Sequence, residues 1–202
     1  MNLSSCQRDP KRCRFSLPND IWKLELRPQG FSILAYLCYL HTRCENFIVP
    51  GADEIASQLR MSRDTAAEQI AELNRRGLLD QNMVPMFGGT SKNFFSLPNE
   101  LFFLNIGHGA ITVYAYLLYC EDRRTHQCHP SYRTISGAVH LTVATVMKHI
   151  TKLADRQFIT LENTSYIDRH GMKQNGNNLY TILPIQSAMD HCYHQQMLRL
   201  KK

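Results

Sequence analysis

The pentapeptide "FSLPN" occurs twice in this chain, at residues 15–19 and again at residues 95–99, eighty positions later. A chain of 202 residues can hold one large domain or two small ones, because domains commonly run about 100 to 150 residues. Length alone does not choose between these two possibilities. The repeat offers a way to choose, provided that the similarity extends beyond five residues.

The similarity continues when residues 15–80 are laid over residues 95–160 without a gap. "AYLCY" at 35–39 then meets "AYLLY" at 115–119. Further identities at the same offset pair the following residues: Arg43, Pro50, Ile55, Thr65, Ile70, Leu73 and Arg76 with Arg123, Pro130, Ile135, Thr145, Ile150, Leu153 and Arg156. Most of the differences exchange one apolar residue for another. The sequence therefore predicts one domain built twice.

Each unit shows the same order of local signals. An extended opening ends before proline, since the residue before proline avoids the helical region. An apolar helix is expected at Gly30–Arg43 in the first unit and at Ala110–Arg123 in the second. A second helix and a tight turn follow, and the hydroxyl of Ser62 or Thr142 is placed to cap a third helix.

Extended segments follow the third helix of each unit. In the second unit, residues 158–184 have β-branched and aromatic runs around a Gly- and Asn-rich centre, which predicts a β-hairpin. In the first unit a shorter hairpin is expected, with Gly88-Gly89 at its turn and residues 93–98 as its return strand. That strand would also open the second unit, so the two domains are expected to abut without a flexible linker.

Three helices, the last two forming a helix-turn-helix, followed by a hairpin wing make the winged-helix plan. The predicted fold is mainly α with small β-hairpins (α+β), in tandem winged helix-turn-helix domains with a C-terminal helix. The predicted parts are a basic tail at 1–14, a first domain at 15–97, a second domain at 95–184 and the helix at 185–202.

The two third helices differ in charge, although they are otherwise alike. Asp64, Glu68 and Glu72 form a stripe on the first, where the second has Ala144, Lys148 and Lys152. Carboxylates facing DNA phosphates would repel them, whereas lysines release counterions and add affinity. The first unit has seven basic and nine acidic residues, and the second has six basic and four acidic. The second unit is therefore the predicted DNA reader.

The candidate DNA-binding residues come from three places in the second unit. They are the start of its second helix, the exposed face of its third helix and the tip of its wing. The set is Ser131, Tyr132, Arg133, Thr142, Thr145, Lys148, His149, Lys152, Arg169 and Lys173. The alternative for Lys148 and Lys152 is that they only solvate a surface helix.

Other segments leave alternatives open. The arginines around the third helix of the first unit, which are Arg60, Arg63, Arg75 and Arg76, could pair with its acidic stripe or hold phosphates, and a scaffold or protein-contact role is favoured. The C-terminal helix could form a homodimer or pack back on its own domain. The basic tail could add nonspecific DNA affinity or be a solubilising end.

Several kinds of protein find little support. The net charge of +6 suggests an anionic partner, and no apolar run is long enough for a membrane span. The N-terminal residues lack the apolar centre of a secretory signal, so a cytoplasmic protein with free thiols is expected.

The chain shows neither a metal-binding nor a catalytic motif. No zinc template is matched by the spacing of His126, Cys128, His129 and Cys120. No catalytic motif is present, so neither enzyme activity nor a cofactor or metal is expected.

The segments "LPNELFFL", "VYAYLLYCEDRRTHQCHPSYRTI", "LTVATVMKHITKLADRQFIT" and "NGNNLYTILPIQSA" carry a resemblance that covers most of residues 95–190. They resemble bacterial winged helix-turn-helix proteins of plasmids, phages and conjugative elements, and more distantly replication initiator and DnaD-like amino-terminal domains. The chain departs from the family in having Gln157 where a glycine usually ends the recognition helix, and in the acidic stripe of its first unit.

The resemblance implies DNA binding in replication, transfer or transcriptional control of a mobile element. It places Pro130-Ser131-Tyr132 at the second helix and Thr142, Thr145 and Lys148 on the recognition helix. The expected function is that of a duplex DNA-binding regulator or replication accessory. The alternative is an adaptor of a replication or transfer complex, which would bind other proteins of that complex and have only nonspecific DNA affinity.

Overall fold

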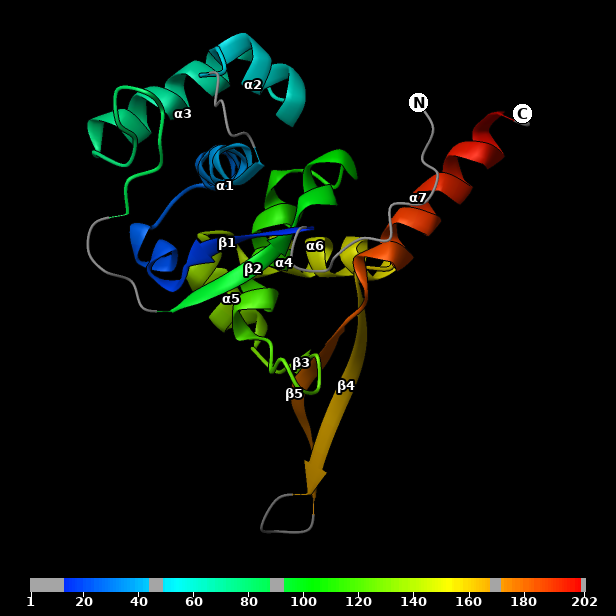
Figure 1. Cartoon of the computed structure of the whole chain (residues 1–202). Coiled ribbons are helices and arrows are strands. Elements are labelled where there is room, and N and C mark those ends of the chain that lie inside the picture. The colour runs from blue at the N-terminus through cyan, green and yellow to red at the C-terminus, as the bar shows by residue number, and fades with distance from the viewer. Residues whose placement is uncertain (1–12, 44–48, 88–92, 168–171, 201–202) are drawn as a thin grey trace.

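The computed structural model describes residues 13–43, 49–87, 93–167 and 172–200, and at 164–167 and 173–177 it describes the backbone alone. Two similar sets of helices are followed by a long β-hairpin and a C-terminal helix (Figure 1). The fold is α+β, mostly helical with small antiparallel sheets, as the sequence predicts.

The elements of the two units recur at the offset of eighty residues. The first unit consists of β1 (Arg14–Pro18), a 3-10 turn (Asn19–Leu24), α1 (Pro28–Arg43), α2 (Ala52–Leu59) and α3 (Arg63–Arg75). The second consists of β2 (Phe94–Pro98), a 3-10 turn (Asn99–Phe103), α4 (His108–Cys120), α5 (Tyr132–Val139) and α6 (Val143–Asp155). The bounds of α5 and α6 are those of α2 and α3 plus eighty, so the helix-turn-helix spans the same positions in both units.

The predicted partner of β2 is wrong. Residues 94–98 do not return along a wing of the first unit but pair antiparallel with β1. The register places Ser16 opposite Ser96, with their hydroxyl oxygens 3.3 Å apart. These serines occupy the same position in the two "FSLPN" copies. A local two-fold axis therefore passes between them. Each strand buries its Phe and Leu on one face, so the pairing joins two apolar faces into one core.

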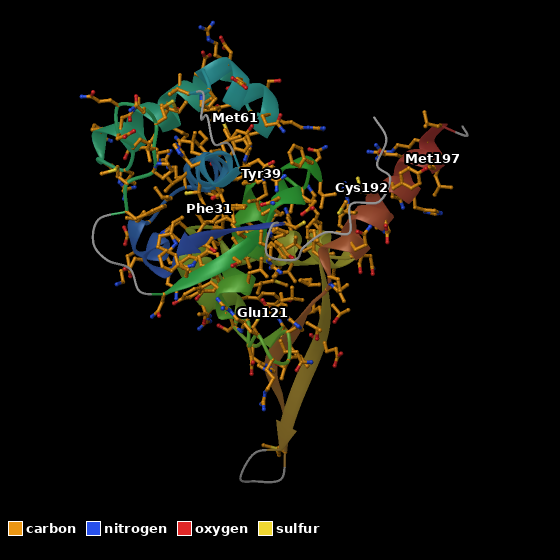
Figure 2. All side chains as sticks on the ribbon, viewed as in Figure 1. Phe31, Tyr39, Met61, Glu121, Cys192 and Met197 are labelled. Carbon is orange, nitrogen blue, oxygen red and sulfur yellow. The ribbon has the colours of Figure 1, made fainter. Side chains whose placement is uncertain are left out.

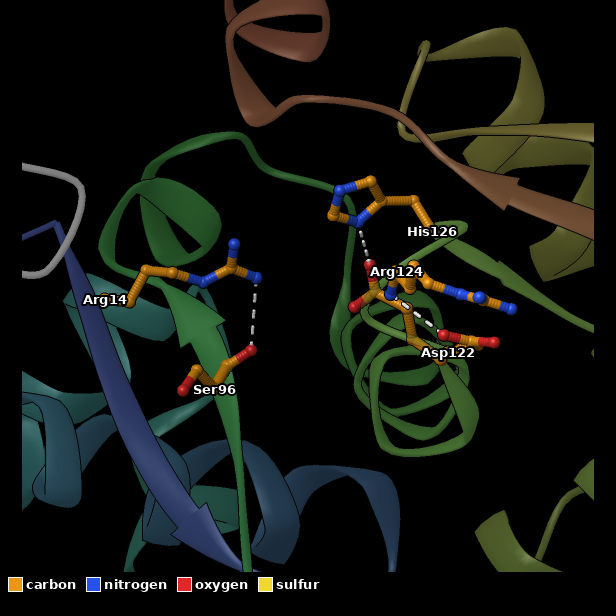
Figure 3. Close-up of polar contacts among 6 residues, drawn as sticks. Arg14, Ser96, Asp122, Arg124 and His126 are labelled. Carbon is orange, nitrogen blue, oxygen red and sulfur yellow. Dashed lines mark hydrogen bonds and ion pairs between the residues drawn. The ribbon is translucent and has the colours of Figure 1, made fainter.

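Hydrogen bonds at the strand ends repeat this two-fold relation. The backbone N–H of Asn19 donates to the carbonyl of Asn93, and that of Asn99 donates to the carbonyl of Cys13, both at 3.0 Å. The guanidinium of Arg14 adds a bond to the carbonyl of Ser96 at 3.3 Å (Figure 3). Both copies of the pentapeptide therefore join the units.

A cluster of aromatic rings surrounds the paired strands and obeys the same symmetry. Ring centroids of Phe15 and Phe102 are 5.7 Å apart, and those of the equivalent Phe95 and Trp22 are 5.8 Å apart. Trp22 also meets Tyr116 edge to face at 5.0 Å, as Phe102 meets Tyr36 at 5.3 Å. α1 packs against α4 beside this cluster, so the two units share one hydrophobic core.

The first unit has only a short turn after α3 among the described residues. Leu79 and Pro85 form an isolated antiparallel bridge, and the carboxylate of Asp80 accepts bonds from the N–H groups of Asn82 and Val84. The predicted hairpin turn at 88–89 lies outside the described residues. This unit therefore has the helix-turn-helix without a described wing sheet.

The caps of α3 and α6 are confirmed. The hydroxyls of Ser62 and Thr142 accept from the backbone N–H of Thr65 at 3.1 Å and of Thr145 at 3.2 Å. At the other end Gly77 has φ of +66°, and the equivalent Gln157 has φ of 61°. Gln157 therefore adopts the left-handed conformation that glycine favours, which keeps the cap geometry although the residue type differs.

α4 ends at Cys120, short of the predicted Arg123. Asp122 begins a turn there, in which its carboxylate accepts the N–H of Arg124 at 2.8 Å (Figure 3). The chain then forms β3 (Gln127–Cys128), a strand that was not predicted. β3 pairs with β5, so the Gln127–Cys128 part of "HQCHP" forms the edge strand of the wing sheet.

The wing of the second unit is a long hairpin, as predicted. β4 (Ile159–Ile167) and β5 (Lys173–Ile182) pair antiparallel, and the sheet order is β3-β5-β4. The hairpin projects from the helical body (Figure 1). A register irregularity lies between Asn163 and Ser165.

The C-terminal segment forms α7 (Ile185–Leu200). Its first turns pack on the domain through buried Ala188 and half-buried Ile185, Met189 and Cys192. Its last turns extend away from the body, and Met197 lies there (Figure 2). Within the described part of the chain, no helix has the length and apolar character of a membrane span.

Candidate nucleic-acid interface

The orientation of α6 is set by its apolar residues. Val146, Ile150 and Leu153 are fully buried against the domain core, at the spacing of one helical face. α6 packs on α4, while α3 packs on α1. Because α1 and α4 pack on each other, this central pair separates the two third helices (Figure 1).

The opposite face of α6 is open to solvent. Six residues of α6 are exposed, namely Val143, Ala144, Met147, Lys148, Thr151 and Asp155. Lys148 makes no ion pair with any described residue. The Thr151 hydroxyl donates to the carbonyl of Met147 at 3.1 Å. Three of the six side chains are apolar, and all three lie in the first two turns.

The hydroxyl residues predicted to bind DNA have structural partners. Ser131 caps α5, since its hydroxyl accepts from the N–H of Thr134 at 3.1 Å. Thr142 caps α6, and its hydroxyl oxygen lies 2.8 Å from that of Thr145. Tyr132 is half-buried against the core. Ser131 and Thr142 therefore fix the starts of the two helices, and their hydroxyl oxygens already accept a backbone N–H.

The predicted cationic and imidazole residues divide into two groups. Arg133 and Lys148 are exposed, on α5 and α6 respectively. His149 and Lys152 are half-buried and lie against the start of α4 instead. A Cβ added at Gly109 would come within 2.2 Å of the His149 ring, and one added at Gly107 would lie 3.9 Å from the Lys152 ammonium.

The packing of His149 affects its protonation. Burial lowers the pKa of this imidazole, and the nearby charge of Lys152 adds to the effect. Burial also lowers the pKa of His108 at the start of α4. Both histidines therefore resist protonation in the folded chain.

We expect the free energy of unfolding to fall as the pH is lowered from about 7.5 to about 5.5. The unfolded chain takes up protons at the ordinary histidine pKa near 6.5, whereas the folded chain binds them less readily. Urea unfolding at the two pH values measures the difference. His149→Gln introduces the residue found at the equivalent position 69 and should reduce that difference. An unchanged pH dependence in this variant would contradict the role assigned to His149.

The side chains of the two wing residues in the predicted set lie outside the described part of the chain. Arg169 lies outside the described residues, and Lys173 begins β5 with only its backbone described. Their contribution to DNA contact stays a prediction.

The exposed face of α3 differs from that of α6. Asp64 and Glu68 are exposed, and Glu72 forms an ion pair with Arg75. Arg63 pairs with Asp53 at 2.8 Å, and Arg76 donates to the carbonyl of Leu24. Three of the arginines that could have held phosphates thus have partners within the first unit.

A groove of about 310 Å³ lies between the start of α1 and the second half of α3. Glu25, Arg27, Glu68 and the half-buried Glu72 line it together with the buried amide of Gln69. In the second unit, His149 and Lys152 occupy the positions equivalent to Gln69 and Glu72. Their side chains lie next to Gly109 and Gly107, at the start of α4. The first unit thus has a polar, partly acidic groove where the second has an imidazole and an ammonium group.

The region around "HQCHP" has no metal-binding geometry among the described residues, in which no cluster of three or more His, Cys, Asp or Glu side chains is found. An imidazole nitrogen of His126 lies 2.6 Å from the carboxylate of Glu121. Cys128 is buried, and burial raises the pKa of its thiol to about 12. A thiol in this environment stays protonated at neutral pH.

Comparison with known proteins agrees with this geometry. Residues 104–159 match the family model of a helix-turn-helix domain, and this span runs from just before α4 to the first residue of β4. No match was found among curated proteins. Among solved structures, the chain is similar to a "Possible transcriptional regulator from Methanosarcina mazei Go1", with 18% identity over 57% of this chain and 91% of that chain and a TM-score of 0.35. The match to the family model and the geometry of α5 and α6 agree on a helix-turn-helix in the second unit.

Proposed function

We propose that this protein binds duplex DNA through its second unit and acts as a transcriptional regulator or as a replication or transfer accessory. α6 enters the major groove, and the wing of β4 and β5 lies along the adjacent backbone or groove. The helix-turn-helix match at residues 104–159 supports this assignment. The resemblance to proteins of plasmids, phages and conjugative elements supports a mobile element as its setting.

The observation that carries the proposal is the charge of the exposed face of α6. Lys148 stands there without an acidic partner among the described residues, and Arg133 is exposed on α5. At the position of Lys148 the otherwise similar α3 has Glu68. A lysine on this face gains from counterion release at phosphates, whereas a glutamate would be repelled.

Fluorescence anisotropy with labelled duplexes tests the proposal. The full chain is titrated against random duplex and against a duplex recovered by rounds of binding selection, at two salt concentrations. We expect a consensus sequence that binds at least about a thousandfold more tightly than random DNA, and an affinity that falls steeply with salt. Equal and weak binding to both duplexes would refute sequence-specific recognition.

A second candidate function is a protein adaptor, and the groove and acidic face of the first unit favour it. Exposed Asp64 and Glu68 suit a basic protein surface better than DNA. The central α1/α4 pair separates this face from α6, so one molecule could hold DNA and a replication or transfer protein together. Coprecipitation of a partner by the wild-type chain, lost in an Asp64→Lys/Glu68→Lys variant that still binds DNA, would support this role.

The exposed end of α7 suits a homodimer contact. Tyr193, Met197, Leu198 and Leu200 are exposed on its last turns, beyond the part that packs on the domain. Two copies joined there would present two α6 helices to paired half-sites. Sedimentation velocity of the full chain and of a Tyr193→Ser/Met197→Ser variant separates dimer from monomer.

A further inference from the structure

The exposed face of α6 is unusual for a polar partner such as DNA. Val143 has 37% of its surface exposed and Met147 has 47%, and Ala144 lies exposed between them. Single exposed apolar side chains are common on protein surfaces. Here, however, they occupy the first two turns of the helix whose N-terminal residues reach base edges in a helix-turn-helix.

Few hydrogen-bonding groups remain on this face to read purine edges. The hydroxyls of Thr142 and Thr145 bond to each other in the cap of α6, and that of Thr151 donates its proton to the Met147 carbonyl. His149 lies on Gly109, away from the exposed face. Of the exposed side chains on the first two turns of α6, only Lys148 ends in a free polar group, because exposed Thr151 and Asp155 lie on the later turns.

The C5-methyl group of thymine is the apolar feature of the major groove, and apolar side chains contact it. We propose that Val143, Ala144 and Met147 read thymine methyl groups, so that the target of this protein is defined by thymines under the first two turns of α6. The inference rests on the proposed function and adds to it the kind of base that is recognised. Lys148 and Arg133 supply phosphate contacts that flank the apolar patch.

The first unit shows that this patch is not a general feature of the repeat. The positions equivalent to Val143, Ala144 and Met147 are Arg63, Asp64 and Ala67. Of these, Arg63 pairs with Asp53, and Asp64 is exposed. The apolar patch thus occurs only in the second unit. The third helix of that unit also carries Lys148, whose charge is complementary to DNA.

Replacing thymine by deoxyuracil tests the inference, because this change removes only the methyl group. The selected duplex and its deoxyuracil version are titrated with the wild-type chain, with Met147→Ala and with Lys148→Ala. For the wild type we expect about a fourfold loss of affinity for each contacted methyl, the value that follows from burying one methyl group. Met147→Ala should bind the two duplexes with a ratio closer to one.

Lys148→Ala is the matched control, since it should weaken binding to both duplexes by the same factor and leave their ratio unchanged. Both side chains are exposed, so circular dichroism should show the same fold in both variants. Equal wild-type affinity for the two duplexes, or a selected consensus without thymine, would overturn the thymine inference while DNA binding stands. Absence of salt-dependent binding to any duplex would overturn the proposed function together with it.

Discussion

Phe102→Ala should lower the free energy of unfolding of the whole chain by roughly 3–5 kcal/mol, the usual cost of removing a buried phenylalanine ring. Phe102 belongs to the second unit, yet its ring packs on Phe15, Tyr36 and Tyr39 of the first, at centroid distances of 5.7, 5.3 and 5.6 Å. Only 6% of the residue is exposed. Its removal therefore weakens the shared core and not one unit alone.

The neighbouring Phe103 provides the control. It is 55% exposed and, among the described residues, its ring meets only that of Tyr39, at 6.3 Å. Phe103→Ala should cost about 1 kcal/mol or less, the range of an exposed aromatic pair. Urea unfolding followed by tyrosine and tryptophan fluorescence and by circular dichroism measures both variants.

The number of unfolding transitions also tests whether the two units share one core. A shared core predicts that both probes report one cooperative transition in the wild type, since neither unit can unfold without exposing the aromatic cluster. Two separate transitions, with Phe102→Ala affecting only one of them, would contradict the joining role assigned to β1, β2 and the rings around them.

The helices could be predicted from the sequence because their signals are local. The spacing of Val146, Ile150 and Leu153 marks the inner face of α6, and the hydroxyl of Thr142 marks its start. The end of α4 was missed because the turn at Asp122 depends on its carboxylate, which accepts the Arg124 N–H, and on backbone bonds to residues 125–127. A charged residue in a run of polar residues gives no clear signal for such a turn.

The partner of β2 could not be predicted by the same means. Alternation of Phe95 and Leu97 with polar neighbours predicts a strand, but it does not specify which strand pairs with it. The local signals therefore predict β2 in a hairpin of the first unit, with a partner strand close to it in the sequence. The structure pairs β2 with β1, a distant segment with the same alternation, because the two apolar faces then form one continuous face over the shared core.

The candidate site was predicted in part. The exposure of Lys148 follows from its place opposite Ile150 and Leu153 on the helix. The inner residues of α6 also place Ala144 on the outer face. The exposure of Val143 does not follow from this pattern, because it lies three residues before Val146 and seven before Ile150. The positions of His149 and Lys152 depend on Gly107 and Gly109 of another helix, so only the packing of α6 on α4 reveals them.

Lys148→Glu should have the largest effect on DNA binding of any single substitution on α6. The change removes one counterion-releasing contact and places a carboxylate against the phosphates. At about 0.1 M salt we expect affinity for duplex DNA to fall by roughly tenfold to a hundredfold, and the slope of log K against log salt to decrease by about one. The loss should be similar for selected and random duplex, because a phosphate contact carries no sequence information.

The repeat supplies a matched control at the equivalent position of the first unit. Glu68→Lys changes the charge of the chain by the same amount in the opposite sense, on an exposed residue of α3. If the second unit alone contacts DNA, this variant should gain only the small, salt-sensitive affinity of one added surface charge and keep the wild-type consensus. Anisotropy titrations at several salt concentrations compare the variants with the wild type. A Glu68→Lys gain as large as the Lys148→Glu loss would mean that net charge, and not the face of α6, determines DNA binding.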